Sequence, residues 1–135
     1  MAGDLSITAA NVLADEDATV VQGVFGETIT AGMSLFMHTD SKLWKAKDDT
    51  AAHAACCGIA LNGGAAGQPG AYLAGGGINP GATVAVGTIY GVTDTFGGIG
   101  PISERGSTDY VTTIGIATTA TRIAVAIVAS GVAIP

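Results

Sequence analysis

The stretch GETITAGMSLFM at residues 26–37 has a counterpart at residues 81–92, where the sequence reads GATVAVGTIYGV. Three aligned positions are identical, two glycines and one threonine. Other positions keep their apolar character, as in the pair Ile29 and Val84 and the pair Leu35 and Tyr90. Both copies are rich in glycine and β-branched residues. This pattern indicates a structure built by repetition and suited to a scaffolding role, not one specialised cleft.

Two further markers extend the repeat along the chain. The segment GIA at residues 58–60 returns at residues 115–117, and a glycine followed by an aliphatic residue occurs at Gly23, Gly77 and Gly131. These markers predict pseudo-repeats at about residues 23–76 and 77–131 of a single β domain, residues 22–135. Residues 1–21 lie outside the repeat and are predicted to form an extended N-terminal arm.

The predicted secondary structure is a series of short strands separated by glycine-rich turns. The strands are expected at residues 28–30, 35–38, 43–46, 57–61, 71–74, 83–86, 88–93, 110–117 and 123–128. Residues 48–54 can form one helical turn, with Asp48 or Asp49 as its N-cap. Short strands with turns at nearly regular spacing predict an all-β fold, a small barrel or sandwich in which two halves close around one core.

The composition favours a protein that works inside an assembly. Of its 135 residues 12% are charged, about half the usual share for a soluble domain. A monomer with so few charges keeps much apolar surface in water, whereas an assembly covers it. The net charge of −6, with five Lys and Arg residues in all, argues against nucleic acid as a partner.

The sequence also argues against a membrane span and a disulfide framework. The longest run without polar residues near the C-terminus is residues 123–129, and seven residues cannot cross a bilayer. Asp4 and the acidic residues 15–17 interrupt any signal-peptide core. Cys56 and Cys57 are adjacent and are the only cysteines, so they are read as small apolar residues entering a buried strand.

The residue types needed for catalysis do not form a recognisable motif. His38 and His53 lie in different segments, and the cluster of His53, Cys56 and Cys57 lacks a second cluster that would complete a metal site. No nucleophile elbow or phosphate-binding loop is present in the sequence. Lys42 could sit at a hairpin tip as in lipoyl carriers, but its surroundings are unlike their motif. We therefore expect no enzyme activity, no cofactor and no metal.

Taken together, these segments resemble the small capsid decoration (cement) proteins of tailed bacteriophages and related prophages. The matching segments of the first half are ITAANV (7–12), ITAG (29–32), WK (44–45), GIALNG (58–63) and AGQP (66–69). Those of the second half are GGI (97–99), DYVT (109–112), GIAT (115–118) and ASGVA (129–133). These are turn and strand signatures, so they identify a fold family better than a role.

The resemblance implies a β-rich, commonly trimeric protein without enzymatic activity, located where capsomers meet. Its partners would be the major capsid protein and other copies of itself, on a virion surface after synthesis in the bacterial cytoplasm. We expect four apolar arm residues to contact the capsid or a neighbouring subunit: Leu5, Ile7, Val12 and Leu13. Deletion of residues 2–21 is expected to leave a folded protein that no longer binds shells.

A second interpretation is a virion-surface module that recognises a glycan or a host surface. It predicts that exposed aromatic residues gather on one face, with Trp44, Phe96 and Tyr72 as candidates. An enzyme would instead require a pocket in which His38 or His53 meets a carboxylate. Trp44 has a plainer explanation as a hairpin aromatic that covers the end of the core.

Overall fold

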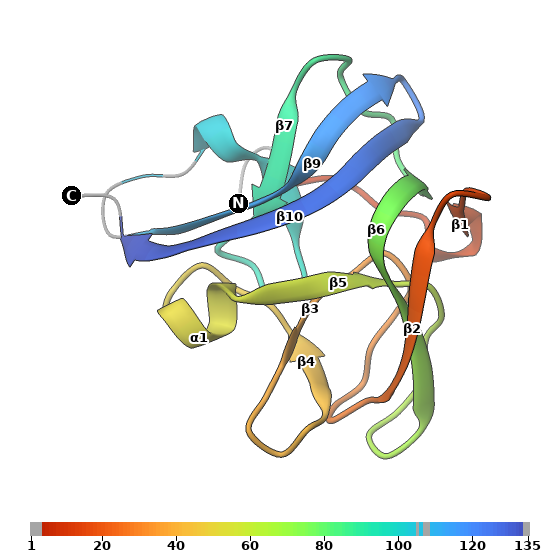
Figure 1. The fold of residues 1–135 in the computed structure, drawn as a ribbon, viewed down its shortest axis with the longest axis vertical. Helices are drawn as coiled ribbons and strands as arrows, with labels where there is room; N and C mark the ends of the chain where they lie inside the picture. The colour runs from red at the N-terminus through yellow and green to blue at the C-terminus, as the bar shows by residue number, and fades with distance from the viewer. Residues whose placement is uncertain (1–3, 105, 107–108, 134–135) are drawn as a thin grey trace.

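The computed structural model describes residues 4–104, 106 and 109–133 (Figure 1). Within these residues ten strands form one antiparallel sheet that curls into a half-barrel, as the predicted all-β fold requires. The strands are β1 (Val12–Ala14), β2 (Thr19–Val24), β3 (Ser34–Met37), β4 (Leu43–Lys45), β5 (Cys56–Ala60), β6 (Pro69–Pro80), β7 (Ile89–Val92), β8 (Ile99–Pro101), β9 (Tyr110–Thr119) and β10 (Arg122–Ala133). The short helical segments are η1 (Ala9–Asn11), α1 (Ala51–Ala54) and η2 (Ile102–Glu104).

The strand pairing is the same in both halves of the chain. The sheet order is β4-β3-β5-β6-β10-β9-β7-β8, so the run β4-β3-β5-β6 is mirrored by β8-β7-β9-β10. Leu35 lies opposite Gly58 in the first half, and Tyr90 lies opposite Gly115 in the second. In both ladders the register shifts at the next residue. The duplicated segments therefore form the same local ladder twice.

The recurring segment GIA has a packing reason in each half. A Cβ atom added to Gly58 would meet the carbonyl oxygen of Leu73 on β6. A Cβ atom added to Gly115 would meet the carbonyl oxygen of Ala124 on β10. At both positions the neighbouring strand approaches so closely that only glycine leaves room.

The buried side chains form two clusters. The smaller cluster belongs to the first half and consists of Phe25, Ile29, Leu35, Leu43, Ala60 and Tyr72. The larger cluster joins both halves and consists of Ala46, Cys56, Ile59, Leu73, Ile78, Val84, Tyr90, Val92, Ile99, Ile114, Ala117, Ile123 and Val125. Because strands of both halves share this second cluster, neither half buries its apolar face alone.

Two predicted strands, residues 28–30 and 83–86, are loops in the structure. Ile29 makes an isolated bridge and is buried, and Val84 is also buried from a loop. Their alternating pattern reflects a single apolar anchor in each segment, not a strand that pairs along its length. Burial of the anchor was therefore correctly indicated, whereas the strand assignment was wrong.

The predicted helical turn at residues 48–54 is present as α1, but its cap differs from the expected one. The side chain of Thr50 accepts a hydrogen bond of 3.1 Å from the backbone N–H of His53. Asp49 instead contacts the imidazole of His53. Thr50 is the residue directly before the helix, so it occupies the capping position that the aspartates miss.

The N-terminal arm lies against the chain's own body. The Leu5 amide donates to the carbonyl of Ile99 at 2.7 Å, and the Thr8 amide donates to that of Gly81 at 2.8 Å. Strand β1 pairs with β6, and β2 crosses residue 21, the predicted end of the arm. Deletion of residues 2–21 would remove β1 and half of β2, so we no longer expect the truncated protein to keep its fold.

Candidate functional site

The structure separates the four predicted arm residues into two groups. Leu5, Ile7 and Val12 are partly buried and pack against the larger core cluster. The side chain of Leu13 is 66% exposed. The first three therefore hold the arm on the body, and Leu13 is the one of the four whose side chain is mostly exposed.

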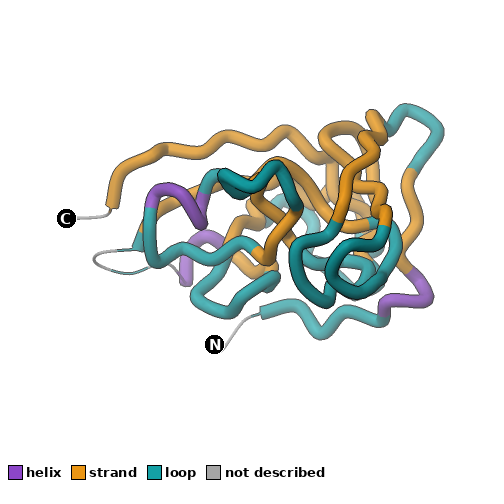
Figure 2. Tube along the Cα trace, turned by 90° about the horizontal axis from the view of Figure 1, so that it is seen from below, coloured by secondary structure: helices purple, strands orange, loops and turns teal. Residues whose placement is uncertain are grey.

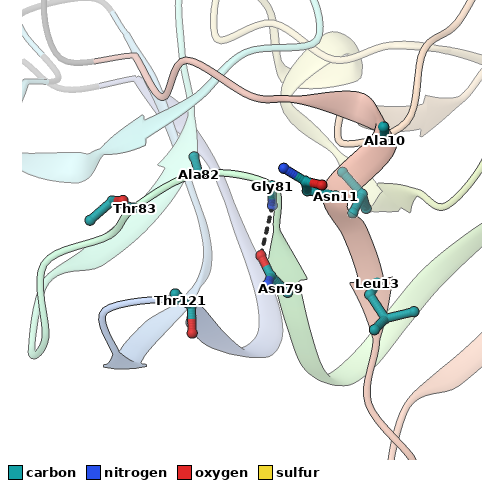
Figure 3. Close-up of a pocket in the computed structure, with 9 residues that line it drawn as sticks. Ala10, Asn11, Leu13, Asn79, Gly81, Ala82, Thr83 and Thr121 are labelled. Atoms are coloured by element: carbon teal, nitrogen blue, oxygen red, sulfur yellow. Dashed lines mark hydrogen bonds between the residues drawn. The ribbon is translucent and has the colours of Figure 1, made fainter.

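Leu13 borders a shallow depression of about 490 Å³ beside the arm, which we call the arm depression (Figure 3). Figure 3 shows Leu13 and Asn11 on the arm side, with the turn after β6 and the tip of the β9–β10 hairpin facing them. The Asn79 side chain accepts a hydrogen bond of 3.0 Å from the Gly81 amide, which fixes this turn. The lining is formed by Ala10, Asn11, Val12, Leu13, Asn79, Gly81, Ala82, Thr83 and Thr121.

A second apolar surface lies on the β7–β9–β10 side of the sheet. Ile89, Ile116 and Ala124 are exposed and lie opposite one another across these three strands. Among the described residues, β10 pairs with β6 only over residues 123–126 and continues with β9 alone. Val128 on this free segment is 64% exposed. Figure 1 shows this end of the hairpin projecting away from β6.

The strand register connects these two surfaces across one face of the sheet, because Leu13 lies opposite Asn79 on β6, and Gly77, two residues earlier, lies opposite Ala124. Figure 2 shows the segment that follows the N-terminus running along one side and the strand that leads to the C-terminus along the other. Leu13 and Val128 are thus exposed aliphatic side chains on separate strands of the same sheet, β1 and β10.

A third feature is a cleft of about 350 Å³, which we call the aromatic cleft. Its lining consists of Glu27, Phe36, His38, Trp44, Lys45, His53 and Phe96. Both histidines of the chain, its only tryptophan and two of its three phenylalanines thus meet at one place. Of the aromatics predicted to gather, Trp44 and Phe96 do so, whereas Tyr72 is buried in the smaller core cluster.

Trp44 is held in place on two sides. Its indole N–H donates to both carboxylate oxygens of Asp40 at 3.2 Å. Its ring lies against the backbone of Gly26, where any Cβ atom would overlap the indole. Desolvation opposes ionisation of Asp40, but hydrogen bonds from the Lys42 amide and the Trp44 indole outweigh it and lower the pKa of this carboxyl. The carboxylate form that fixes Trp44 is therefore favoured.

The aromatic rings of the cleft contact one another, three pairs at tilted angles and one pair edge to face. Phe36 contacts His38 and His53, with ring centroids 5.6 and 5.3 Å apart. His38 also contacts Trp44 at 5.6 Å, and His53 contacts Phe96 at 5.9 Å. The five rings thus form a continuous wall. The alternation of residues 35–38 placed Phe36 and His38 on one face, but nothing local in the sequence indicated that α1 would bring His53 to it.

Two features are relevant to enzyme activity: the adjacent cysteines and the contact between His53 and Asp49. Burial raises the pKa of Cys56 to about 12 and that of Cys57 to about 11, so both are neutral thiols near pH 7 and not nucleophiles. His53 Nδ1 lies 2.7 Å from Asp49 Oδ1, the kind of contact that an enzyme site would need. Among the described residues, no three His, Cys, Asp or Glu side chains are grouped to hold a metal ion.

No family model matches the chain, and no curated protein matches it. Within the described residues, none of the helices combines the length and apolar character needed to cross a membrane.

Proposed function

We propose that this protein is a head decoration (cement) protein of a tailed bacteriophage or prophage. It binds the outer capsid surface at capsomer junctions and stabilises the mature shell. Its partners are the major capsid protein and two further copies of itself, on the virion surface after synthesis in the bacterial cytoplasm. This role requires no enzymatic activity, cofactor, nucleic acid or membrane.

The observation that supports this proposal best is the exposed aliphatic area of an otherwise well-packed body. Leu13, Val86, Val128 and Val132 are all more than half exposed. In a chain with 12% charged residues, few charges are available to prevent association through these side chains. Ile89, Ile116 and Ala124 add an exposed apolar group that is contiguous across β7, β9 and β10, and contiguous apolar surface marks an interaction site. A role in an assembly accounts for this surface without invoking chemistry at a pocket.

The physical advantage of such a protein comes from linked contacts. A trimer placed at a three-fold junction holds several capsid subunits at once. Once one contact forms, the others become intramolecular and bind at a high effective concentration, so the whole clamp is far tighter than one contact. Each subunit then needs only a small interface, below about 1,200 Å².

Binding to shells tests the proposal directly. Purified protein is mixed with expanded heads that lack it, and electron cryo-microscopy is used to look for added density at the three-fold positions. We expect the wild-type protein to add this density. Heads without added density at a large excess of protein would contradict the proposal.

The role of the arm is tested in the same assay with Leu13→Asp. Because Leu13 is 66% exposed, the variant is expected to fold and to lose head binding by about tenfold or more. Met37→Asp is the matched control, since Met37 is an exposed apolar residue on β3. Equal occupancy of heads by Leu13→Asp and by wild type would exclude Leu13 from the interface. The decoration role itself is decided by whether the wild-type protein binds the heads.

A further inference from the structure

The aromatic cleft contains more exposed aromatic surface than packing of the core explains. Phe96 is 48% exposed on the loop between β7 and β8, whereas Phe25 is fully buried in the core. Aromatic residues make up 5% of the chain, yet five aromatic or imidazole rings line this one cleft. Exposed rings grouped with polar side chains are typical of a binding site.

From this cleft we infer a second binding activity, recognition of a neutral hexopyranose unit of a glycan. The first support is the rigidity of the aromatic wall. The Asp40 carboxylate holds the indole of Trp44, and the ring rests on Gly26. A wall that is ordered before the ligand arrives loses little side-chain entropy on binding. Such rings can pack against the C–H face of a sugar, which is apolar.

The second support is the hydrogen-bonding capacity of the two histidines. His38 Nδ1 accepts the backbone N–H of Thr39 at 2.7 Å, so its neutral ring carries the proton on Nε2 as a donor. His53 Nδ1 donates to Asp49, so the Nε2 of its neutral ring is an acceptor. Sugar hydroxyl groups supply both complements, an acceptor for the first nitrogen and a donor for the second. A ligand without hydroxyl groups would leave both nitrogens unpaired in the complex.

The third support is the balance of charge around the cleft. Lys45 Nζ lies 3.9 Å from Glu27, and Lys47 Nζ lies 3.9 Å from Asp49 and 4.6 Å above the Phe96 ring. Each of these two lysines therefore has an acidic partner, so neither ammonium group is left over to pair with a charged ligand. The volume of about 350 Å³ is at the small end of small-molecule pockets, as suits one sugar ring with part of a second.

Trp44 makes the proposal directly measurable, because it is the only tryptophan in the chain. The full-length protein is titrated with the methyl glucopyranosides and galactopyranosides, and Trp44 fluorescence is recorded. We expect a saturable change for at least one of these glycosides, with a dissociation constant of about 1 mM. No saturable change with any of them up to about a hundredfold that concentration would overturn the proposal.

Three variants separate sugar recognition from a general aromatic surface. Phe96→Ala is expected to weaken binding by about tenfold without unfolding the protein, and Met37→Ala, equally apolar and 45% exposed, is expected to leave it unchanged. His38→Phe keeps a ring but loses the Nε2 donor, so it should weaken glycoside binding. Glycoside binding that is unchanged in both Phe96→Ala and His38→Phe would place the site elsewhere.

A parallel titration with indole and with glucuronate tests the ligand class. Tighter binding of either compound than of every neutral glycoside would replace a neutral sugar with an aromatic or acidic ligand and overturn the assignment. These measurements use the isolated protein without heads. Failure of sugar binding therefore leaves the decoration proposal standing, and failure of head binding leaves the sugar site standing.

Discussion

At the residue scale, Cys56 and Cys57 show how the sheet decides the chemistry of a side chain. Cys56 lies in the larger core cluster at the start of β5, and Cys57 is half-buried beside Tyr72. Burial in apolar surroundings disfavours the charged thiolate, which raises the pKa of both thiols above the ordinary value of 9.0. Two cysteines that could have been reactive are thereby kept neutral.

This pair predicts a loss of stability in alkali. A thiol with a raised folded-state pKa favours folding fully below pH 9, and the favourable contribution disappears as pH rises toward the folded pKa of about 11 or 12. The free energy of unfolding should fall between pH 9 and 11 by up to about 1.4 kcal/mol per pH unit for each thiol. Urea unfolding of wild type and Cys57→Ala measures this, because other titrating groups are common to both. Identical pH slopes for the two proteins would show that Cys57 carries no such linkage.

At the scale of the elements, β5 and β9 show why the repeat retains its glycines. Gly58 and Gly115 occupy matched places in the two ladders, opposite Leu35 and Tyr90. Each lies where the next strand's backbone comes too close for a side chain. The large residue on one side and the glycine on the other are therefore complementary, and the pair recurs as a unit.

Gly115→Ala should destabilise the protein by about 1–3 kcal/mol, because the added methyl group overlaps the Ala124 carbonyl and forces β9 and β10 apart. Gly75→Ala is the control, since an added Cβ atom there meets its nearest neighbour, the Val125 carbonyl oxygen, at an ordinary 3.8 Å. That variant should be neutral or slightly more stable. Thermal or urea unfolding measures the stability of both variants. Equal stabilities would mean that the close approach of the neighbouring strand does not explain why glycine recurs at this place in the repeat.

At the scale of the whole molecule, the arm joins the two halves. Arg122 at the tip of the β9–β10 hairpin forms an ion pair with Asp15, just after β1. Ile7 packs on Gly32 in the first half, and the Leu5 amide bonds to Ile99 in the second. A segment outside the sequence repeat therefore closes the structure that the repeat forms.

The arm's dual role predicts opposite results for two neighbouring aliphatic residues. Ile7→Ala should lower the free energy of unfolding by about 1–2 kcal/mol, less than the loss at a fully buried site, because Ile7 is partly buried. Leu13→Ala should change it by less than about 0.5 kcal/mol, because Leu13 is exposed. Urea unfolding checks both, with the same slope of unfolding free energy against urea concentration in each variant. A neutral Ile7→Ala would mean that the arm does not contribute to the core in solution.

The aromatic cleft could be anticipated only in part. The interpretation as a surface-recognition module required Trp44 and Phe96 to share a surface, and both line this cleft. It also suggested Tyr72, which is instead 8% exposed within the smaller core cluster. His53 reaches the cleft because α1 folds back toward β3, and that approach depends on contacts between segments far apart in the chain.

By itself, the sequence determined the all-β class, the two-fold repetition and the glycine turns, with Gly32 and Gly87 both at positive φ of +92° and +83°. These features follow from local spacing and backbone sterics, which a chain carries in its own order of residues. Only the tertiary structure decided that Ile29 and Val84 anchor loops, that Leu13 is exposed while Ile7 is packed, and which rings form a cleft. Those outcomes depend on which distant surfaces meet, because burial is a property of the whole packed molecule and not of any one segment.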